Sequence, residues 1–389
     1  MTAIIFTGKG GVGKTTCAAA TAVQLAKGGA RVLIASSDAA HSLGDCLMSR
    51  IGGQPAQIFG SLHAMEIDAR MEMRSRFGEV RDTMLANMEA SGLDSALAAE
   101  MIEFPGAEEL FAMLRLAEVR AANTYDFVVL DCAPTGNTLR FLNFSEFLSP
   151  IQRALKIERA YNRITGPLAK LAGKKPLSKE SYYDAIFQTF SDIEDARTSM
   201  LDDDTRFRVV LNPERLAIIE SQRAVSFLNV AGFFVDAIIA NRVLSAEITD
   251  PFFGHWKTAH QRYLTDIREQ FQPIRVLEVP LCEREVAGID DLARLGETLY
   301  PGIDAGQKLT AERPFELERN GSSYQLRFRI PALDRAELVL ETTDAGLFVK
   351  IGHFERRIQL PTALADAAVS SAKYDQRFLT LEFATAGAN

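Results

Sequence analysis

The sequence is poor in cysteine and in clustered positive charge. Its four cysteines are scattered along 389 residues, and no two of them form a C-x-x-C pair. This spacing argues against a structural zinc site and suits a reducing compartment. Lys and Arg number 43 against 51 Asp and Glu, so the formal net charge is -8. An acidic balance of this kind argues against nucleic acid as a partner.

Long apolar runs are lacking as well. The most apolar interior stretch, residues 224–240, is interrupted by Asn229, Gly232 and Asp236, and it falls short of the roughly 20 apolar residues that span a bilayer. The N-terminus runs directly into a strand-like segment without a basic or Ser/Arg-rich leader. We therefore expect a soluble cytoplasmic protein, or one of an organelle stroma or matrix whose transit peptide has been removed.

The first three quarters of the chain alternate short apolar runs with longer helical patterns. This alternation is typical of βαβ units around a mainly parallel sheet. The apolar runs are rich in Val, Ile and Leu without strict alternation, as expected where helices cover both faces of the sheet. The sequence predicts a doubly wound α/β fold with strands at residues 3–6, 31–35, 127–130, 208–211, 237–240 and 275–279.

Residues 65–120 are predicted to form successive helices, which with residues 141–200 make a helical subdomain. Seven of the ten methionines lie in the first of these segments, at positions 65, 71, 73, 84, 88, 101 and 113. Methionine is flexible and polarizable, so a surface rich in it can repack against varied apolar partners. The same side chains would equally fill ordinary helix cores, and the sequence leaves both interpretations open.

The pattern changes after residue 300. Residues 306–313 lose apolar periodicity and are predicted to be a linker between an N-terminal domain, 1–305, and a C-terminal domain, 314–389. Apolar and polar residues then alternate along 324–330, 347–351 and 379–383. This period of two predicts antiparallel strands with one buried face, and hence a small all-β sandwich.

The segment from Gly8 to Thr15 matches G-x-x-x-x-G-K-[ST], between a predicted strand and a predicted helix. Its backbone N–H groups are expected to surround the phosphates of ATP. Lys14 should reach the β- and γ-phosphates, and the Thr15 hydroxyl should bind Mg²⁺. The predicted nucleotide-binding residues here are Gly8, Gly10, Gly11, Val12, Gly13, Lys14, Thr15 and Thr16.

Two further loops follow predicted strands and carry carboxylates. One contains Asp38 in the run S-S-D-A-A-H-S-L, and the other begins with Asp131 and continues C-A-P-T-G-N-T-L-R. Ligands of open α/β sheets bind at the carboxyl ends of the strands, where both aspartates are expected. An alternative for Asp38 is that it caps the helix that follows.

These three loops, with Lys9 directly after the first glycine, resemble the ArsA family of anion-transporting ATPases and the related ATPases that target tail-anchored membrane proteins. The resemblance covers nearly all of residues 1–300. It implies that Lys9 reaches the nucleotide of a second subunit and that Asp38, at the Mg²⁺ site, orients the attacking water. It further implies that Asp131 holds Mg²⁺ and that Gly136 senses the γ-phosphate.

Asn241 and the loop near Pro280 match the positions that contact adenine in that family, although an asparagine at a strand end often only turns the chain. The sequence also departs from the family. Ala39 replaces the usual proline of the first loop, the inter-subunit zinc cysteines are absent, and so is the arsenite-binding cysteine triad. We therefore expect a dimer without zinc and disfavour metalloid export.

Residues 315–383 resemble the α-crystallin domain of small heat-shock proteins, through Leu360-Pro361 and the closing run Leu379 to Phe383. Together the two resemblances imply a Mg-ATP-dependent homodimeric ATPase whose nucleotide state opens and closes an apolar groove. The implied clients are hydrophobic or amphipathic helices, such as those of tail-anchored proteins, with a transient membrane receptor as a further partner. The alternatives are a regulatory switch like the chromosome-partitioning and division-site ATPases, and a subunit of a metalloid or anion pump.

Overall fold

The structure is a computed structural model of the whole chain. It describes residues 1–38, 42–90, 94, 107–132, 152–161 and 180–311 of the N-terminal part. In the C-terminal part it describes residues 313, 315–320, 323–331, 338–343, 346–351, 354–358, 364, 369–375 and 377–384. Gly136, Ala39 and the apolar run 141–148 lie outside the described residues.

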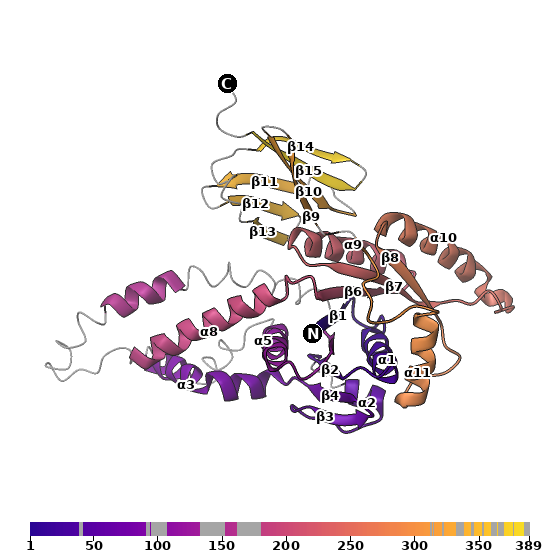
Figure 1. Ribbon diagram of the computed structural model, residues 1–389, viewed down its shortest axis with the longest axis horizontal. Helices are drawn as coiled ribbons and strands as arrows, with labels where there is room; N and C mark the ends of the chain where they lie inside the picture. Colours follow the sequence, from indigo (N-terminus) through magenta and orange to yellow (C-terminus); the bar gives the residue numbers. More distant parts are fainter. Residues whose placement is uncertain are drawn as a thin grey trace.

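An eight-stranded sheet forms the centre of the N-terminal part, with the strand order β3-β4-β2-β5-β1-β6-β7-β8 (Figure 1). Its neighbouring strands are parallel except for the edge pair of β3 and β4. The strands are β1 (Thr2–Thr7), β2 (Val32–Ser36), β3 (Ala56–Phe59), β4 (Leu62–Glu66), β5 (Phe127–Asp131), β6 (Thr205–Leu211), β7 (Val235–Val243) and β8 (Arg275–Pro280). The six strands predicted from apolar runs are confirmed, as is the α/β class.

Alternate residues of the strands enter two separate cores, one on each face of the sheet. In β1, Ala3 and Ile5 belong to one core while Ile4 and Phe6 belong to the other. The core that contains Ile4 and Phe6 is covered by α1 (Lys14–Lys27), α2 (Ser42–Leu47) and α11 (Gly288–Leu299). The opposite face is covered by α5 (Ala107–Ala122), α8 (Glu180–Ser199), α9 (Arg215–Val230) and α10 (Gly254–Phe271).

The predicted helical segment starts later than residue 65. Met65 lies in β4, where its side chain is buried in the sheet core, and the helix α3 spans Ala69–Ala90. The short strands β3 and β4 were not predicted, because polar residues such as Gln57 and His63 interrupt their apolar pattern. Among the described methionines of this segment, Met113 is also buried, whereas Met71 is 62% exposed. No helix within the described residues has the length and apolarity needed to cross a membrane.

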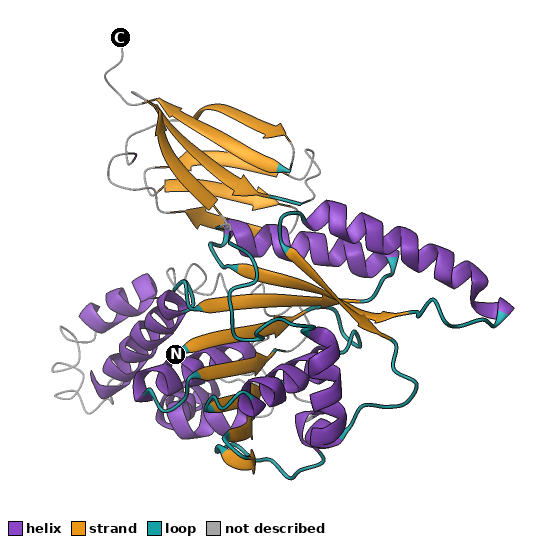
Figure 2. Ribbon diagram, turned by 45° about the vertical axis from the view of Figure 1, so that its right-hand side comes forward, coloured by secondary structure: helices purple, strands orange, loops and turns teal. Residues whose placement is uncertain are grey.

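The C-terminal part is a β-sandwich, as predicted (Figure 2). Its four-stranded sheet has the order β14-β15-β10-β9, and its three-stranded sheet the order β11-β12-β13. The apolar face of β10, with Leu326 and Phe328, packs with Leu347 and Val349 of β12. The strands are β9 (Phe315–Asn320), β10 (Ser323–Arg329), β11 (Leu338–Thr343), β12 (Gly346–Ile351), β13 (Phe354–Ile358), β14 (Val369–Asp375) and β15 (Phe378–Ala384).

The sandwich rests on the ends of α9 and α10. Val230 at the end of α9 belongs to the sandwich core, and Asn229 Nδ2 donates a hydrogen bond of 3.0 Å to the Arg329 carbonyl. The Arg329 guanidinium in turn donates to the carbonyl of Phe271, the last residue of α10, at 2.7 Å. Buried polar contacts of this kind fix the orientation of two packed units, because each unpaired group would be costly.

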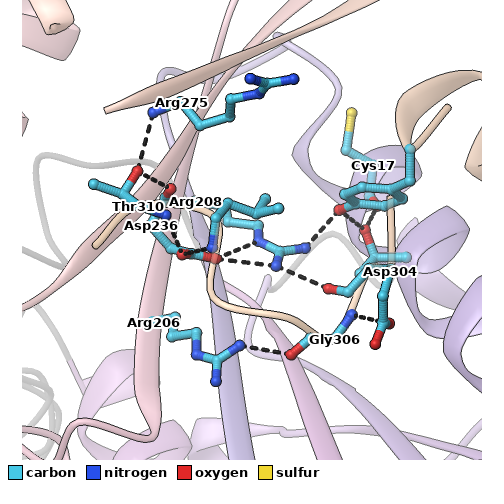
Figure 3. A network of polar contacts seen from close by, with 12 residues as sticks. Cys17, Arg206, Arg208, Asp236, Arg275, Asp304, Gly306 and Thr310 are labelled. Carbon is cyan, nitrogen blue, oxygen red and sulfur yellow. Dashed lines mark hydrogen bonds and ion pairs between the residues drawn. The ribbon is translucent and has the colours of Figure 1, made fainter. Parts of the chain in front are cut away.

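The segment that joins the two parts is bound to the α/β core through buried polar groups (Figure 3). Arg208 of β6 is fully buried and donates to Asp236 Oδ2 and to the carbonyl of Ala305, at 3.1 and 2.9 Å. Asp236 Oδ1 accepts from the backbone N–H of Leu309 at 2.7 Å. Arg208 Nη1 also donates to the hydroxyl of Tyr300 at 2.6 Å. Residues 305–310 therefore run along the core rather than away from it.

Candidate functional site

The loop between β1 and α1 lies at the carboxyl ends of the strands, and two of its glycines stand where a side chain would collide with neighbouring atoms. Gly8, Gly11 and Gly13 have φ values of 150°, 77° and 93°, a region that side chains disfavour. A Cβ on Gly8 would lie 2.2 Å from the Val210 carbonyl oxygen, and one on Gly13 would lie 2.3 Å from the Asn241 amide nitrogen. Glycine is thus required at both positions for the loop to curl before the helix starts at Lys14.

Asp131 stands at the end of β5, directly beneath the start of α1. Its Oδ2 accepts hydrogen bonds from the hydroxyls of Thr15 and Ser36, at 2.7 and 3.2 Å. Its Oδ1 is buried and has no hydrogen-bond partner among the described residues. The Ser42 hydroxyl lies 3.3 Å from that of Thr15. Ser36 and Ser42 were not predicted, although hydroxyls that flank a strand-end loop are a usable signal.

This set of oxygens fits a magnesium ion. Mg²⁺ prefers oxygen donors, and Oδ1 of Asp131, which is unpaired as far as the structure describes the chain, is a buried acceptor that a cation or its water would satisfy. Burial raises the pKa of Asp131 to about 6, against the lowering effects of Thr15 and Lys14. A bound divalent cation would restore the charged carboxylate, because it adds positive charge beside the buried oxygens.

Lys14 and Asp38 complete the polar centre of the site. The Lys14 amine is buried, donates to the Lys9 carbonyl at 3.3 Å, and is close enough to Asp131 and Asp38 to interact electrostatically with both. Desolvation lowers the pKa of Lys14, and the two carboxylates oppose that shift. The Asp38 backbone N–H donates to the Ser36 hydroxyl at 3.3 Å, which holds the first loop against β2.

Lys9 leaves the loop in a different direction from Lys14. Its amine lies 3.4 Å from Glu220 Oε1 on α9, and both side chains are nearly half exposed. The signature lysine is thus held at the surface beside the nucleotide loop, although Glu220 was not predicted as its partner. Lys9 and Glu220 are 211 residues apart along the chain, so no local sequence pattern predicts their contact.

The two residues predicted to contact adenine take different positions. Asn241 is buried at the end of β7, and its amide donates to the Val12 carbonyl at 2.7 Å. It therefore braces the phosphate loop in this structure. Pro280 ends β8 and borders a cavity of about 240 Å³ that is also lined by Cys282, Glu285 and Val286. The roles predicted for Thr16 and Gly136 stay predictions, and Gly136 lies outside the described residues.

Comparison with known proteins bears on these residues. Residues 1–301 match the family described as the anion-transporting ATPases. The chain belongs to this family. It is therefore an ATPase, as the loop at residues 8–15 predicts, and its nucleotide is ATP. Residues 321–383 match the HSP20-like domain found in ArsA, which agrees with the resemblance of the tail to small heat-shock proteins.

Relatives with both parts occur in bacteria. A Chlorobaculum tepidum protein that carries the name of an arsenical pump-driving ATPase is 33% identical over 388 residues, which cover 98% of this chain and 96% of the relative. One of Aquifex aeolicus is 30% identical, with 97% and 98% covered. The ATPase ASNA1 homolog 1 of Paramecium tetraurelia is 31% identical over 303 residues, 75% of this chain and 90% of the relative.

Proposed function

We propose that this ATPase is a magnesium-dependent homodimer that uses ATP to open and close an apolar surface for helices of other proteins. The main support is the orientation of the two lysines of the nucleotide loop, Lys9 and Lys14. Lys14 points into its own site beside Asp131, whereas Lys9 is held outside by Glu220 at the surface. A lysine in that position can reach the nucleotide of a facing subunit, where it would stabilise the charge that develops on the phosphates.

Magnesium would be held by Thr15 and Asp131, and Asp38 would orient the attacking water. The first prediction is supported by the Asp131 oxygen that has no partner among the residues described, and the second by the closeness of Asp38 to Lys14. The ion supplies charge stabilisation when it is bound. Thr15 and Ser36 keep the Asp131 carboxylate oriented, since both hydroxyls donate to the same oxygen.

The client surface is proposed on the helical subdomain. Three of its described residues, Met71, Ile157 and Tyr161, are large and exposed, at 62%, 72% and 59%. Exposed apolar side chains on helices of one subdomain are typical of a surface that accepts an amphipathic helix. The first turn of α5 contains Glu108. Desolvation raises the pKa of Glu108, and electrostatic repulsion from Asp38 raises it further. The subdomain thus reaches the first nucleotide loop, which offers a route for coupling.

Lys9→Ala tests the dimeric mechanism. We expect the variant to bind Mg-ATP but to lose ATP-dependent dimer formation, measured by light scattering across protein concentrations. Lys27→Ala is the matched control, because Lys27 is also an exposed lysine paired with a glutamate, Glu297. If Lys9→Ala dimerises and hydrolyses ATP like the control, the role of Lys9 in a second subunit is wrong.

Asp38→Asn tests both the catalytic assignment and the client. Loss of a water-orienting group should slow hydrolysis at least ~100-fold while Mg-ATP still binds. The variant should therefore hold the closed form, and a synthetic apolar helix of about 20 residues, the length of a membrane span, should bind it differently with ATP and with ADP. Equal binding in both states would remove the proposed coupling.

A pump subunit is the second candidate, favoured by the names of the bacterial relatives. Its metalloid would need reactive thiolates, yet burial raises the pKa of Cys17 and Cys46 to about 12. Within the described ranges, no three Cys, His, Asp or Glu side chains form a metal-binding group. Stimulation of hydrolysis by arsenite or antimonite would favour the pump and contradict the client proposal.

A further inference from the structure

Large exposed apolar side chains gather at the carboxyl edge of the sheet. Leu216 follows β6, Phe252 and Trp256 follow β7, and Leu281 follows β8, three strands that lie side by side. Phe252 is 73% exposed and Trp256 is 53% exposed. The nucleotide loop and Lys9 lie at this same edge. Large apolar residues are usually covered, so a group of them around a functional site indicates a contact surface.

Phe252 and Trp256 lie farther out than the carboxyl ends of the strands. The side chains of Gln222 in α9 and Gln270 in α10 are hydrogen-bonded, and both helices start at the carboxyl edge. Gln222 lies seven residues after the first residue of α9, and Gln270 lies sixteen after that of α10. At 1.5 Å per residue, α10 therefore extends on the order of 10 Å farther out. In Figures 1 and 2 the start of α10 projects past the ends of β7 and β8.

This projecting tip, residues 244–257, is built rigidly. The Lys257 amine donates to the carbonyls of Ala246 and Ile248, at 2.7 and 2.8 Å, and so holds the loop against the helix. Asp250 Oδ1 accepts from the Phe252 N–H at 2.9 Å. Phe252 packs edge-on against Phe253, with ring centroids 5.2 Å apart. A surface ordered before binding loses little entropy when it is covered.

We propose that the tip is an aromatic contact between two copies of this chain, in which Phe252 and Trp256 of each copy are covered by the other. The proposal rests on the proposed dimer, because it takes the carboxyl edges as the faces that meet when Lys9 reaches the second nucleotide. If the carboxyl ends of the two sheets face each other across a two-fold axis, the projecting tip of each copy lies alongside the other copy.

The chemistry of the tip favours a protein over a membrane. The amine of Lys257, the one lysine of the tip, donates hydrogen bonds to two backbone carbonyls of the tip itself. Asp250 and Glu247 add negative charge, which anionic lipid repels. Aromatic residues, above all tryptophan, are enriched where protein interfaces carry most of their binding energy. The tip thus supplies a non-metal means of holding a dimer whose sequence has no C-x-x-C pair.

Trp256 reports on its own burial, because it is the only tryptophan of the chain. In the Asp38→Asn protein, Mg-ATP should shift its fluorescence to shorter wavelength, and the shift should follow the dimer fraction from light scattering as the protein is diluted. A dimer that forms with unchanged Trp256 emission overturns this inference and leaves the proposed dimer intact. Absence of any dimer overturns both.

Phe252→Ser, which keeps the tryptophan, should raise the dimer dissociation constant at least about tenfold, the scale of losing one anchor residue. Phe59→Ser on the edge strand β3 is the control, since it removes another exposed aromatic side chain. Equal dimerisation of the two variants contradicts the inference. So does a shift of Trp256 emission in nucleotide-free monomer on adding phosphatidylcholine–phosphatidylglycerol vesicles, which would assign the tip to membranes.

Discussion

Two buried aspartates of the central sheet differ in how many of their carboxylate oxygens are hydrogen-bonded to described residues. Asp131 and Asp236 are both fully buried. Asp236 uses both oxygens, accepting from Arg208 on one and from the N–H groups of Leu309 and Thr310 on the other. Asp131 uses one oxygen, and the other has no partner among the described residues. A saturated carboxylate indicates a structural role, whereas an unsaturated one indicates a ligand that completes it.

Asp236→Ala should have the largest effect, and the effect should be on stability. The change leaves the Arg208 charge buried without its carboxylate, and breaking one side of a buried pair costs about 3–5 kcal/mol. Urea unfolding followed by circular dichroism measures the loss, while hydrolysis per folded molecule should stay near that of the native chain. A loss below about 1 kcal/mol would mean that the pair is solvated.

Replacing Arg208 as well should recover part of that loss. Asp236→Ala with Arg208→Leu removes both charges, and apolar replacements of a buried pair are often tolerated. The double variant should therefore be more stable than Asp236→Ala alone. If it is less stable, the network of Tyr300, Ala305 and Arg208 stabilises the fold independently of the carboxylate.

Asp131→Asn should show the opposite pattern. The amide keeps one oxygen for Thr15 and Ser36, so the unfolding free energy without nucleotide should stay within about 1 kcal/mol of the native value. Magnesium-dependent hydrolysis should fall at least about 1000-fold, equivalent to about 4 kcal/mol of transition-state stabilisation. Single-turnover hydrolysis measures the loss. Substantial remaining activity would remove Asp131 from the magnesium site.

Glu109 extends the comparison to a third buried carboxylate. It lies in α5, neither of its carboxylate oxygens has a hydrogen-bond partner on another described residue, and burial raises its pKa from 4.5 to about 7. The folded state then binds more protons than the unfolded state between these values, so the unfolding free energy falls as pH rises through this window. By pH 8 the penalty is complete, at up to about 3 kcal/mol.

Glu109→Gln should remove most of this penalty. We expect its melting temperature to exceed that of the native protein at pH 8 and to approach it near pH 4.5. Glu247→Gln, on an exposed loop, serves as the control and should leave the pH profile unchanged. If the melting temperature of Glu109→Gln varies with pH as that of the native protein does, another group is responsible for the pH dependence.

The sequence predicted what local pattern encodes. Runs of Val, Ile and Leu predicted the six core strands, and the loop at residues 8–15 predicted an ATPase. Contacts between distant residues left no such signal. Glu220 meets Lys9 across the fold, and Asn241 braces the Val12 carbonyl although its predicted role concerns adenine. The short strand β4 was not predicted, because the polar His63 interrupts its apolar pattern.

Glu220→Gln should have the smallest effect and separates Lys9 from its neighbour α9. Both side chains are nearly half exposed, and such ion pairs contribute only about 0–1 kcal/mol. If the contact with Glu220 competes with a contact to the second subunit, releasing Lys9 should tighten ATP-dependent dimerisation up to about fivefold. Glu297→Gln breaks the similar pair with Lys27 and should change nothing. Weaker dimerisation of Glu220→Gln would instead mean that Glu220 positions Lys9 for the second subunit.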